Sequence, residues 1–347
     1  MGGTVSPDEA HSESPGAVHS APTLDDVAAA AGVSRATASR VLNRSSTVRD
    51  ETASRVRAAT ARLGYHPNHA ARSLVTQRTG VVAVLVPETE SRVFTDPFFA
   101  TTYGGALSAF ADTDYQVVLA LSHPGHTVDR MARILTSGIA DGALVVSHHT
   151  SMAERLINSG QTLVFVGDPG VPGALWVDVD QKRAAYEATG YLVNRGIRAI
   201  ASITGPADMG SGRMRLDGFR ARLVEAGLDP SWTQEADFTP QGAEAATRRL
   251  LALHPDVEGL FVASDLMSSG VLRVLAEHRL RVPDDVLLVS FDNSSVATQT
   301  VPALTTMEGH AADLGREAGL MLLARLRGEK TDSSRLLASH VVKRDSC

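Results

Sequence analysis

Seven short apolar runs constrain the fold of this 347-residue chain more than any other feature. The runs are rich in β-branched residues and are bounded by glycine, proline, aspartate or serine; they lie at residues 81–86, 116–121, 142–146, 162–166, 200–203, 259–263 and 286–291. Helical patterns separate them, which is typical of parallel sheets covered by helices on both faces. Because residues 80–347 are many for a single sheet of this kind, we expect two doubly wound α/β lobes, with a break near Val179.

The segments that follow these strands are the candidate ligand-binding positions, since ligands bind beyond the carboxyl ends of the strands in such sheets. Residues 96–99, 205–218 and 291–293 stand out there. Arg213 offers a planar fork of five donors and Asp292 a pair of acceptors, while Phe98 or Phe99 supplies an apolar wall. Together they suit a polyhydroxylated ligand. Taken singly, each is better explained as a surface ion pair or a core aromatic.

The segment from Thr23 to Asn43 predicts two short helices joined by a tight turn. Thr23 and Asp26 have the spacing of a capping box at the start of the first helix, which we expect to run to residue 31. Gly32 ends that helix because it tolerates the left-handed conformation, and Ser34 is placed to cap a second helix over residues 35–43. Two helices joined by a three-residue turn that contains glycine form a helix-turn-helix.

The second of these helices has an apolar face and a polar, arginine-bearing face. The polar face can offer guanidinium groups to guanine edges in a major groove, although a merely solvated helix would show arginines too. Charge favours the first interpretation. Residues 22–78 hold nine arginines against four acidic residues, whereas residues 79–347 carry about −8. One acid-poor block on an acidic body is typical of a nucleic-acid reader joined to another domain.

A third helix is expected over residues 50–63, ended by Gly64, and one or two helical turns over residues 68–75 after the break at Pro67. At this point the chain resembles a known family. The motifs LxDVAxxAGVSxxTxSRVLN, beginning at Leu24, and GYxPNxxARSL, beginning at Gly64, are similar to those of the lactose-repressor/galactose-repressor (LacI/GalR) family of bacterial regulators. The resemblance covers nearly the whole chain from Thr23 onward.

The resemblance assigns DNA-binding roles by position. Residues matching the family's base-reading positions are Arg35, Ala36 and Arg40; those near the phosphates are Ser34, Thr37, Ser39 and Asn43. Leu74 matches the leucine that paired hinge helices insert into the minor groove, where it opens a base step and bends the duplex, and Ala71 lies beside it. Arg35 and Ala36 replace the tyrosine and glutamine of the lactose repressor, so a different operator is expected.

For the body, the resemblance implies a periplasmic-binding-protein-like effector domain. Residues 213–219 match its RxxGF-type segment, which places Arg213, Asp265 and Asp292 among the effector contacts, with Phe99 as the cleft aromatic. Three positions depart from the family: Ser264, Asn293 and Gly167 stand where many members have other polar residues. The pocket lining is therefore altered, and the identity of the sugar, or even that the effector is one, stays open.

The expected organisation has four parts: a disordered tail (1–21), a helix-turn-helix domain (22–66), a hinge (67–79) and an effector-binding and dimerisation domain (80–347). Within the last, one lobe is expected at about 80–179 and 311–338, the other at about 180–310 and 339–347. The tail has no basic or apolar export-signal regions, and no apolar stretch is long enough for a membrane span. With Cys347 as its only cysteine, the chain suits a reducing, cytoplasmic setting.

We therefore predict a homodimeric repressor of palindromic operator DNA, released by a sugar-like effector, with no cofactor, metal or membrane partner. The leucine-heptad extension that makes the lactose repressor a tetramer is absent. The alternatives are a ligand-dependent corepressor-type or nucleoside-sensing regulator of the same fold, an exported solute-binding protein and an enzyme. Against the last, the loop at residues 205–213 lacks the third glycine of GxGxxG and the GK[ST] ending of a phosphate loop, and no catalytic motif is present.

Overall fold

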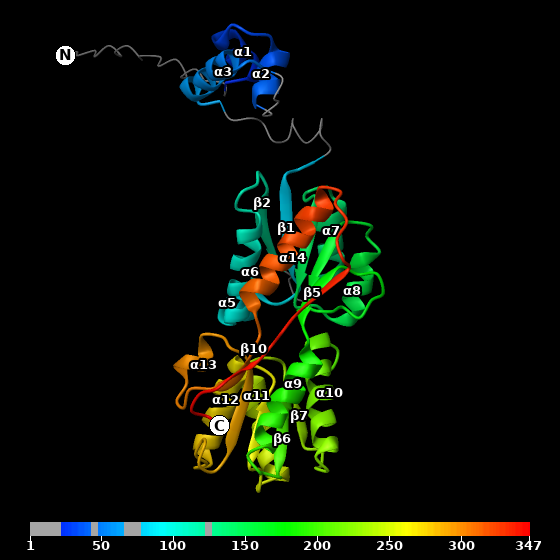
Figure 1. Ribbon diagram of the computed structural model, residues 1–347, viewed down its shortest axis with the longest axis vertical. Coiled ribbons are helices and arrows are strands. Elements are labelled where there is room, and N and C mark those ends of the chain that lie inside the picture. Colours follow the sequence, from blue (N-terminus) through cyan, green and yellow to red (C-terminus); the bar gives the residue numbers. More distant parts are fainter. Residues whose placement is uncertain (1–21, 43–47, 66–77, 122–126) are drawn as a thin grey trace, which may run out of the picture. The chain divides into compact units, whose positions relative to one another are not determined.

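The computed structural model describes residues 22–42, 48–65, 78–121 and 127–347. It divides the chain into two compact units, residues 1–77 and 78–347 (Figure 1). We call the described part of the first unit the head and the second unit the body. Each has its own hydrophobic core, so each is described separately. Within the described ranges, no helix has the length and apolarity required to cross a membrane.

The head consists of three helices: α1 (Leu24–Ala31), α2 (Arg35–Leu42) and α3 (Asp50–Leu63). At the start of α1, the Thr23 hydroxyl accepts a hydrogen bond from the Asp26 amide at 3.3 Å, and the Asp26 carboxylate accepts one from the Thr23 amide at 2.8 Å. Gly32 has φ +64° and ends α1, while Gly64 has φ +61° and ends α3. The predicted helix-turn-helix is therefore confirmed.

Small side chains hold the three head helices together. The buried members of this core come from all three helices and are Val27, Ala28, Ala31, Ala38, Val41, Ala53, Val56 and Ala59. Alanine at so many of these positions lets the helices approach closely. The core positions of α2 fix which of its faces is turned outward.

The body contains two six-stranded sheets. The first has the order β11-β5-β4-β3-β1-β2 and is parallel throughout, with strands β1 (Val81–Val86), β2 (Gln116–Leu121), β3 (Gly142–Val146), β4 (Leu163–Val166), β5 (Trp176–Val179) and β11 (Ser334–Leu337). The second has the order β12-β10-β9-β8-β6-β7, with strands β6 (Ile200–Thr204), β7 (Thr233–Glu235), β8 (Gly259–Val262), β9 (Leu287–Asp292), β10 (Thr305–Glu308) and β12 (Val341–Val342). Among the described strands of this sheet, β12 alone is antiparallel to its neighbour.

Helices cover both faces of each sheet, so both lobes are doubly wound, as predicted (Figure 1). The first sheet packs on one face against α5 (Glu90–Thr95), α6 (Pro97–Ala109) and α14 (Ala311–Leu326), and on the other against α7 (Thr127–Thr136) and α8 (Thr150–Ile157). The second packs on one face against α9 (Gln181–Val193) and α10 (Gly210–Glu225), and on the other against α11 (Pro240–Leu253), α12 (Asp265–Glu277) and α13 (Val296–Gln299).

The chain passes between the two lobes three times (Figure 1). It crosses from β5 to α9, returns from β10 to α14 and crosses again from β11 to β12. These crossings bring the carboxyl ends of the strands of both sheets to the space between the lobes. A site formed there takes its residues from both lobes, which is where parallel sheets of this type place their ligands.

Candidate functional site

In the head, α2 presents a polar, arginine-bearing face to solvent. Ser34 caps it by accepting a hydrogen bond from the Thr37 amide at 3.2 Å. Ala38 and Val41 are buried in the head core. The residues of α2 and its cap predicted to contact DNA are exposed or half-buried: Ser34, Arg35, Ala36 and Arg40 are exposed, while Thr37 and Ser39 are half-buried.

Arg35 has an ion-pair partner that does not immobilise it. Its guanidinium lies 3.5 Å from the Asp25 carboxylate, and the two side chains are 70% and 63% exposed. An ion pair this open to water contributes little to stability and is screened by salt. Arg35 can therefore exchange Asp25 for a base edge or a phosphate without a large energetic penalty.

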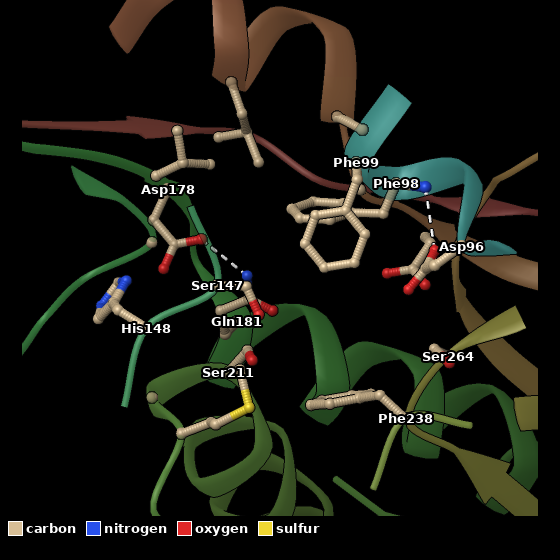
Figure 2. Close-up of a pocket in the computed structure, with 18 of the residues that line it drawn as sticks. Asp96, Phe98, Phe99, Ser147, His148, Asp178, Gln181, Ser211, Phe238 and Ser264 are labelled. Atoms are coloured by element: carbon tan, nitrogen blue, oxygen red, sulfur yellow. Dashed lines mark hydrogen bonds between the residues drawn. The ribbon is translucent and has the colours of Figure 1, made fainter. Parts of the chain in front are cut away.

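In the body, a cavity lies between the lobes (Figure 2). Its wall is formed by the segments after the strands of both sheets, together with the start of α14. The polar or charged lining residues are Arg92, Asp96, Ser147, His148, Asp168, Asp178, Gln181, Ser211, Arg215, Ser264 and Asp292. The apolar lining includes Phe98, Phe99, Val166, Met209, Phe238 and Leu314. A concave site with convergent polar groups and an aromatic wall is suited to a small polar organic ligand.

Arg215, on α10, is the buried guanidinium of this cavity, with 8% of its surface exposed. Its Nε donates to the Gln181 side-chain oxygen at 2.7 Å, and its Nη1 donates to the Ala263 carbonyl and lies 3.4 Å from the Asp292 carboxylate. The guanidinium carbon also lies 3.6 Å from the centre of the Phe291 ring. Burial lowers the pKa of Arg215, and the nearby carboxylates oppose that shift. The side chain is thus fixed in place before any ligand arrives.

Asp292 ends β9 in a backbone conformation that disfavours most side chains. Its φ is +110°, and two other lining residues, Ser147 and Phe238, also have positive φ values of 60° and 61°. Strain of this kind persists only where the surrounding structure imposes it, and it is concentrated at functional sites. Burial raises the pKa of Asp292 well above its usual value, while Arg215 acts in the opposite direction.

The aromatic wall draws on both lobes (Figure 2). Phe98 and Phe99, in the first turn of α6, meet edge to face with ring centres 5.5 Å apart. Phe238 follows β7 in the second lobe. The guanidinium of Arg92 lies 5.8 Å from the Phe99 ring centre and 5.4 Å from that of Phe238, so it bridges the two lobes.

Asp178 provides a buried carboxylate at the end of β5. One oxygen accepts hydrogen bonds from the Val179 amide at 2.8 Å and from the Gln181 side-chain amide at 2.7 Å; the other accepts one from the Asp168 amide at 2.9 Å. Burial raises the pKa of Asp178 to about 6, although these hydrogen bonds favour the ionised form. The carboxylate is therefore ionised near neutral pH and held on three sides.

Comparison with known proteins identifies the family. The HTH-type transcriptional regulator CelR of Thermobifida fusca is 40% identical to this chain over 333 residues, which are 94% of this chain and 98% of CelR. The chain belongs to the lacI family of bacterial regulatory proteins. Residues 23–68 match the description "Bacterial regulatory proteins, lacI family", and residues 189–347 match "Periplasmic binding protein-like domain". The HTH-type transcriptional repressor CytR of Escherichia coli (strain K12) is 30% identical over 94% of this chain and 96% of its own length.

Solved structures agree with this assignment. A structure described as "transcriptional regulator CelR-cellobiose complex" has a TM-score of 0.74 and 38% identity, and the match covers 94% of this chain and all of that one. A lac repressor dimer bound to operator has a TM-score of 0.84 at 24% identity over 94% of this chain and 99% of that one, which shows a shared fold. Like its relatives, this lacI-family chain is a DNA-binding transcription regulator and not an enzyme.

Two predicted effector contacts are not among the residues that line the cavity of this lacI-family body. Arg213 is exposed and does not line the cavity, whereas Arg215 does. The RxxGF spacing in fact begins at Arg215, because Gly218 and Phe219 follow it at the required distance. On α10, a shift of two residues rotates a side chain by about 200°, so the two arginines leave the helix in different directions, and the Arg213 guanidinium lies next to Gly170.

Asp265 also lies outside the cavity lining. It is completely buried at the start of α12, where its carboxylate accepts hydrogen bonds from the Thr306 hydroxyl and the Ser294 amide, both at 2.7 Å. Its position secures the loop after β9 and thereby the neighbouring Asp292. Asp265 is thus a structural residue one layer behind the site.

The other predicted residues divide into two groups. Phe98, Phe99 and Asp292 do line the cavity. Asn43, Ala71 and Leu74 lie outside the described residues, so their roles stay predictions from the family resemblance.

Sequence reasoning missed several lining residues, notably His148, Asp178 and Gln181, and it gave no role to Asp96 although that residue lies in the candidate segment 96–99. Asp178 lies within β5, a four-residue strand that was not predicted; a strand expected at residues 176–179 would have pointed to it. His148 comes directly after β3, which was predicted, so the rule used for the other strands would have found it. Burial lowers the pKa of His148 to about 4, which keeps its ring neutral at physiological pH.

Proposed function

We propose that this regulator is a repressor that binds a palindromic operator as a homodimer and is released when a sugar-like effector occupies the cavity between the lobes. The observation that carries the proposal is the cavity itself, where buried Arg215 and half-buried Asp292 form a pair that faces an aromatic wall. Paired polar groups bind hydroxyls, and aromatic rings pack against the apolar face of a sugar ring. The 38% identical CelR structure is a complex with cellobiose, which supports a carbohydrate here.

For DNA binding, we propose that α2 reads base edges in the major groove through Arg35, Ala36 and Arg40, while Ser34, Thr37 and Ser39 position it on the backbone. The Ala36 methyl suits contact with a thymine methyl. Asn43, Ala71 and Leu74 take their proposed roles from the family resemblance: Asn43 near a phosphate, Ala71 beside the minor groove and Leu74 inserted into it.

For effector binding, we propose Phe98, Phe99, Arg215 and Asp292 as contacts. Because these residues come from both lobes, the ligand favours the state in which the lobes are closed. It can shift DNA affinity only by binding the two body states unequally, with a typical coupling of about 1–3 kcal/mol.

The homodimer is proposed because a two-fold protein matches an operator with two half-sites. Large apolar side chains exposed on the body support it: Phe94 in α5 is 75% exposed and Val301 after α13 is 93% exposed. A second copy of the chain is the occupant that we propose for these surfaces. A cytoplasmic location is proposed because the operator and a reducing environment are found there.

Operator selection followed by release tests the proposal. Purified full-length chain is mixed with fragments of the source genome at moderate salt, and retained fragments are titrated by fluorescence anisotropy with and without cellobiose or other neutral sugars. We expect sequence-selective binding at two half-sites and release by one of the sugars. A sugar that strengthens binding would reverse the polarity to corepression, and the absence of any selective fragment would refute the DNA-binding part.

A further inference from the structure

A continuous chain of hydrogen bonds runs along the cavity wall at the crossing from β5 to α9. The Gln181 side-chain amide donates to Asp178 at 2.7 Å, and its carbonyl accepts from Arg215 Nε at 2.7 Å. Arg215 then reaches Asp292 at 3.4 Å. Figure 2 shows Asp178 and Gln181 side by side in the cavity wall. Both ends of this chain are carboxylates, so it offers hydrogen-bond acceptors to a ligand.

The charges that line the cavity are unequal. The lining carboxylates are Asp96, Asp168, Asp178 and Asp292, whereas among the described lining residues only Arg92 and Arg215 carry a positive charge. Both guanidiniums already face a carboxylate of the protein. Arg215 is paired with Asp292, and Arg92 lies 2.8 Å from Glu88, in a pair whose side chains are 15% and 11% exposed.

We propose that this carboxylate-ended chain selects an uncharged ligand that donates hydroxyl hydrogen bonds, and that it excludes phosphorylated or carboxylated analogues, with Asp178 and Asp96 as the specificity-determining residues. The inference rests on the proposed function, since it names the chemical class of effector for the same cavity. It narrows that function to neutral carbohydrates and separates them from sugar phosphates and sugar acids.

The physical reason is desolvation combined with repulsion. An anion entering this cavity loses its water and meets four lining carboxylates, while both lining guanidiniums already have carboxylate partners. A neutral hydroxyl has no such penalty, and its hydrogen bond to an ionised carboxylate is stronger than one to a neutral acceptor. The cavity therefore discriminates in two ways: binding of a charged sugar carries an energetic penalty, and binding of a neutral sugar is favoured by hydrogen bonds.

Asp178 retains the capacity to accept a ligand hydroxyl. A carboxylate has about four acceptor positions, and three are occupied by Val179, Gln181 and the Asp168 amide. Asp96 is the second such group. One of its oxygens accepts from the Phe98 amide at 3.0 Å, and burial raises its pKa, as expected for a carboxylate enclosed by the cavity wall.

Matched ligand pairs test the proposal in the full-length protein. The probes are cellobiose with cellobiose 6′-phosphate and glucose with glucose 6-phosphate, measured by isothermal titration calorimetry. The 6-O-methyl sugars serve as uncharged probes of similar length and separate size from charge. For the pair whose neutral member binds, we expect the phosphorylated member to bind at least about 100-fold more weakly and the methylated one to lie close to the parent.

Asparagine substitutions test the assigned residues. Asp178→Asn and Asp96→Asn each remove one carboxylate charge from the cavity lining, and Asp96→Asn keeps a side chain that caps α6. We expect either variant to weaken binding of the neutral sugar by roughly 10-fold and to narrow the neutral-to-phosphorylated ratio by about the same factor. Asp217→Asn is the matched control, because Asp217 is exposed on α10 and outside the cavity lining; it should change neither value.

The outcomes separate this inference from the proposed function. Equal binding of the neutral and phosphorylated sugars, or a ratio unchanged in both cavity variants, would overturn the charge-selection inference and leave a sugar-released repressor intact. If none of these carbohydrates binds or releases the operator, the carbohydrate-effector proposal fails, and the inference fails with it. Selective operator binding is scored independently of both.

Discussion

At the scale of single residues, two arginines in one turn of α10 have different environments. Arg215 is buried and held by Gln181, the Ala263 carbonyl and Asp292, whereas Arg213 is exposed. A fork of donors near the end of β6 does not by itself show which of two neighbouring arginines the helix turns inward, although the RxxGF spacing, which begins at Arg215, does. That choice depends on where α10 begins, and Met209, its N-cap, makes no side-chain cap hydrogen bond that could have marked the start.

Arg215→Lys should abolish the effector response while leaving operator binding intact. Lysine keeps a positive charge near Asp292 but cannot donate to Gln181 and Asp292 in a fixed fork. We expect effector affinity to fall roughly 10- to 100-fold, as for the loss of charge-assisted hydrogen bonds. Operator release by the sugar is the measurement. Arg213→Lys is the control and should remain within about two-fold of the wild type; a lost response there as well would reject the correction made above.

Arg40→Ala should relax specificity at one base position. Arg40 is exposed on α2, while its neighbour Val41 is buried and fixes the helix orientation. Losing a bidentate contact to a base is expected to cost about 1–3 kcal/mol at the cognate base pair. Binding to a library of single-base operator variants measures this. Arg62→Ala, at an exposed position of α3, is the comparison variant. If Arg40→Ala weakens the binding of all operator variants equally, Arg40 contacts the phosphates and not a base.

The pKa of Asp178 makes a prediction about stability and pH. Its pKa rises from 3.8 to about 6 on folding, so the protonated form favours the folded state. The corresponding stability is present below the unfolded pKa and is lost as pH rises through about 6. Asp178→Asn has no carboxyl group to ionise at this position, so the variant does not lose this stability as pH rises. Relative to the wild type, the variant should therefore gain roughly 1–2 kcal/mol of unfolding free energy between about pH 5 and pH 7, measured by urea unfolding.

For His148, the predicted change of stability with pH has the opposite sign to that of Asp178, which provides an internal check. Its pKa falls from 6.5 to about 4 on folding, so its contribution to stability is present above 6.5 and is lost as pH falls toward 4. His148→Phe should therefore gain stability relative to the wild type as pH falls, while Asp178→Asn gains it as pH rises. If the stability of the two variants relative to the wild type changed with pH in the same direction, the opposite pKa shifts given to Asp178 and His148 would be wrong.

At the scale of helices and strands, prediction succeeded where local signals were strong. The helix bounds 24–31 and 50–63 agree with the structure because Thr23 and Asp26 mark one start, and Gly32 and Gly64 mark both ends. The strands β5, β7, β10, β11 and β12 were missed. Each is two to four residues long, and runs such as Thr233–Glu235 lack the continuous apolar pattern that marked the equally short β4 and β8. Neighbouring strands, not local sequence, define these segments.

The close contact between α6 and α14 requires glycine at position 105 but not at position 104. A Cβ on Gly105 would lie 2.0 Å from the Ala312 carbonyl oxygen, and one on Gly315 would lie 2.0 Å from that of Thr102. These glycines let the two backbones touch directly. A Cβ on Gly104, one residue earlier, would meet no atom within 4 Å, so the two neighbours form a natural pair for comparison.

Gly105→Ala should destabilise the body by about 1–3 kcal/mol or more, because α6 must move away from α14 or strain its backbone. Gly104→Ala should instead be neutral or stabilising by up to about 1 kcal/mol, since alanine has the higher helix propensity. Urea unfolding of both variants measures the difference. Equal stability of the two variants would mean that the helices separate without cost.

At the scale of the whole body, a clasp across the cavity mouth joins the two lobes. His149, between β3 and α8, contacts the Asp208 carboxylate through Nδ1 at 2.8 Å. The Thr150 amide donates to the Asp208 carbonyl at 3.2 Å, and His149 forms an antiparallel bridge with Met209. Asp208 lies between β6 and α10, so the clasp connects segments of different sheets. It stabilises the arrangement of the lobes in this structure, and we expect that arrangement to be the one that the ligand favours.

Asp208→Ala should therefore raise the sugar concentration needed for half-maximal operator release. The Asp208 side chain is 68% exposed, so the lost contact is partly screened, and the expected change is roughly two- to five-fold. The backbone contacts of the clasp remain, which is why release should be weakened and not abolished. Asp256→Ala, an exposed second-lobe residue away from the cavity, is the control. If both variants release the operator at the wild-type sugar concentration, the clasp has no role in closure. Added salt should reduce the effect of Asp208→Ala, because salt screens exposed ion pairs.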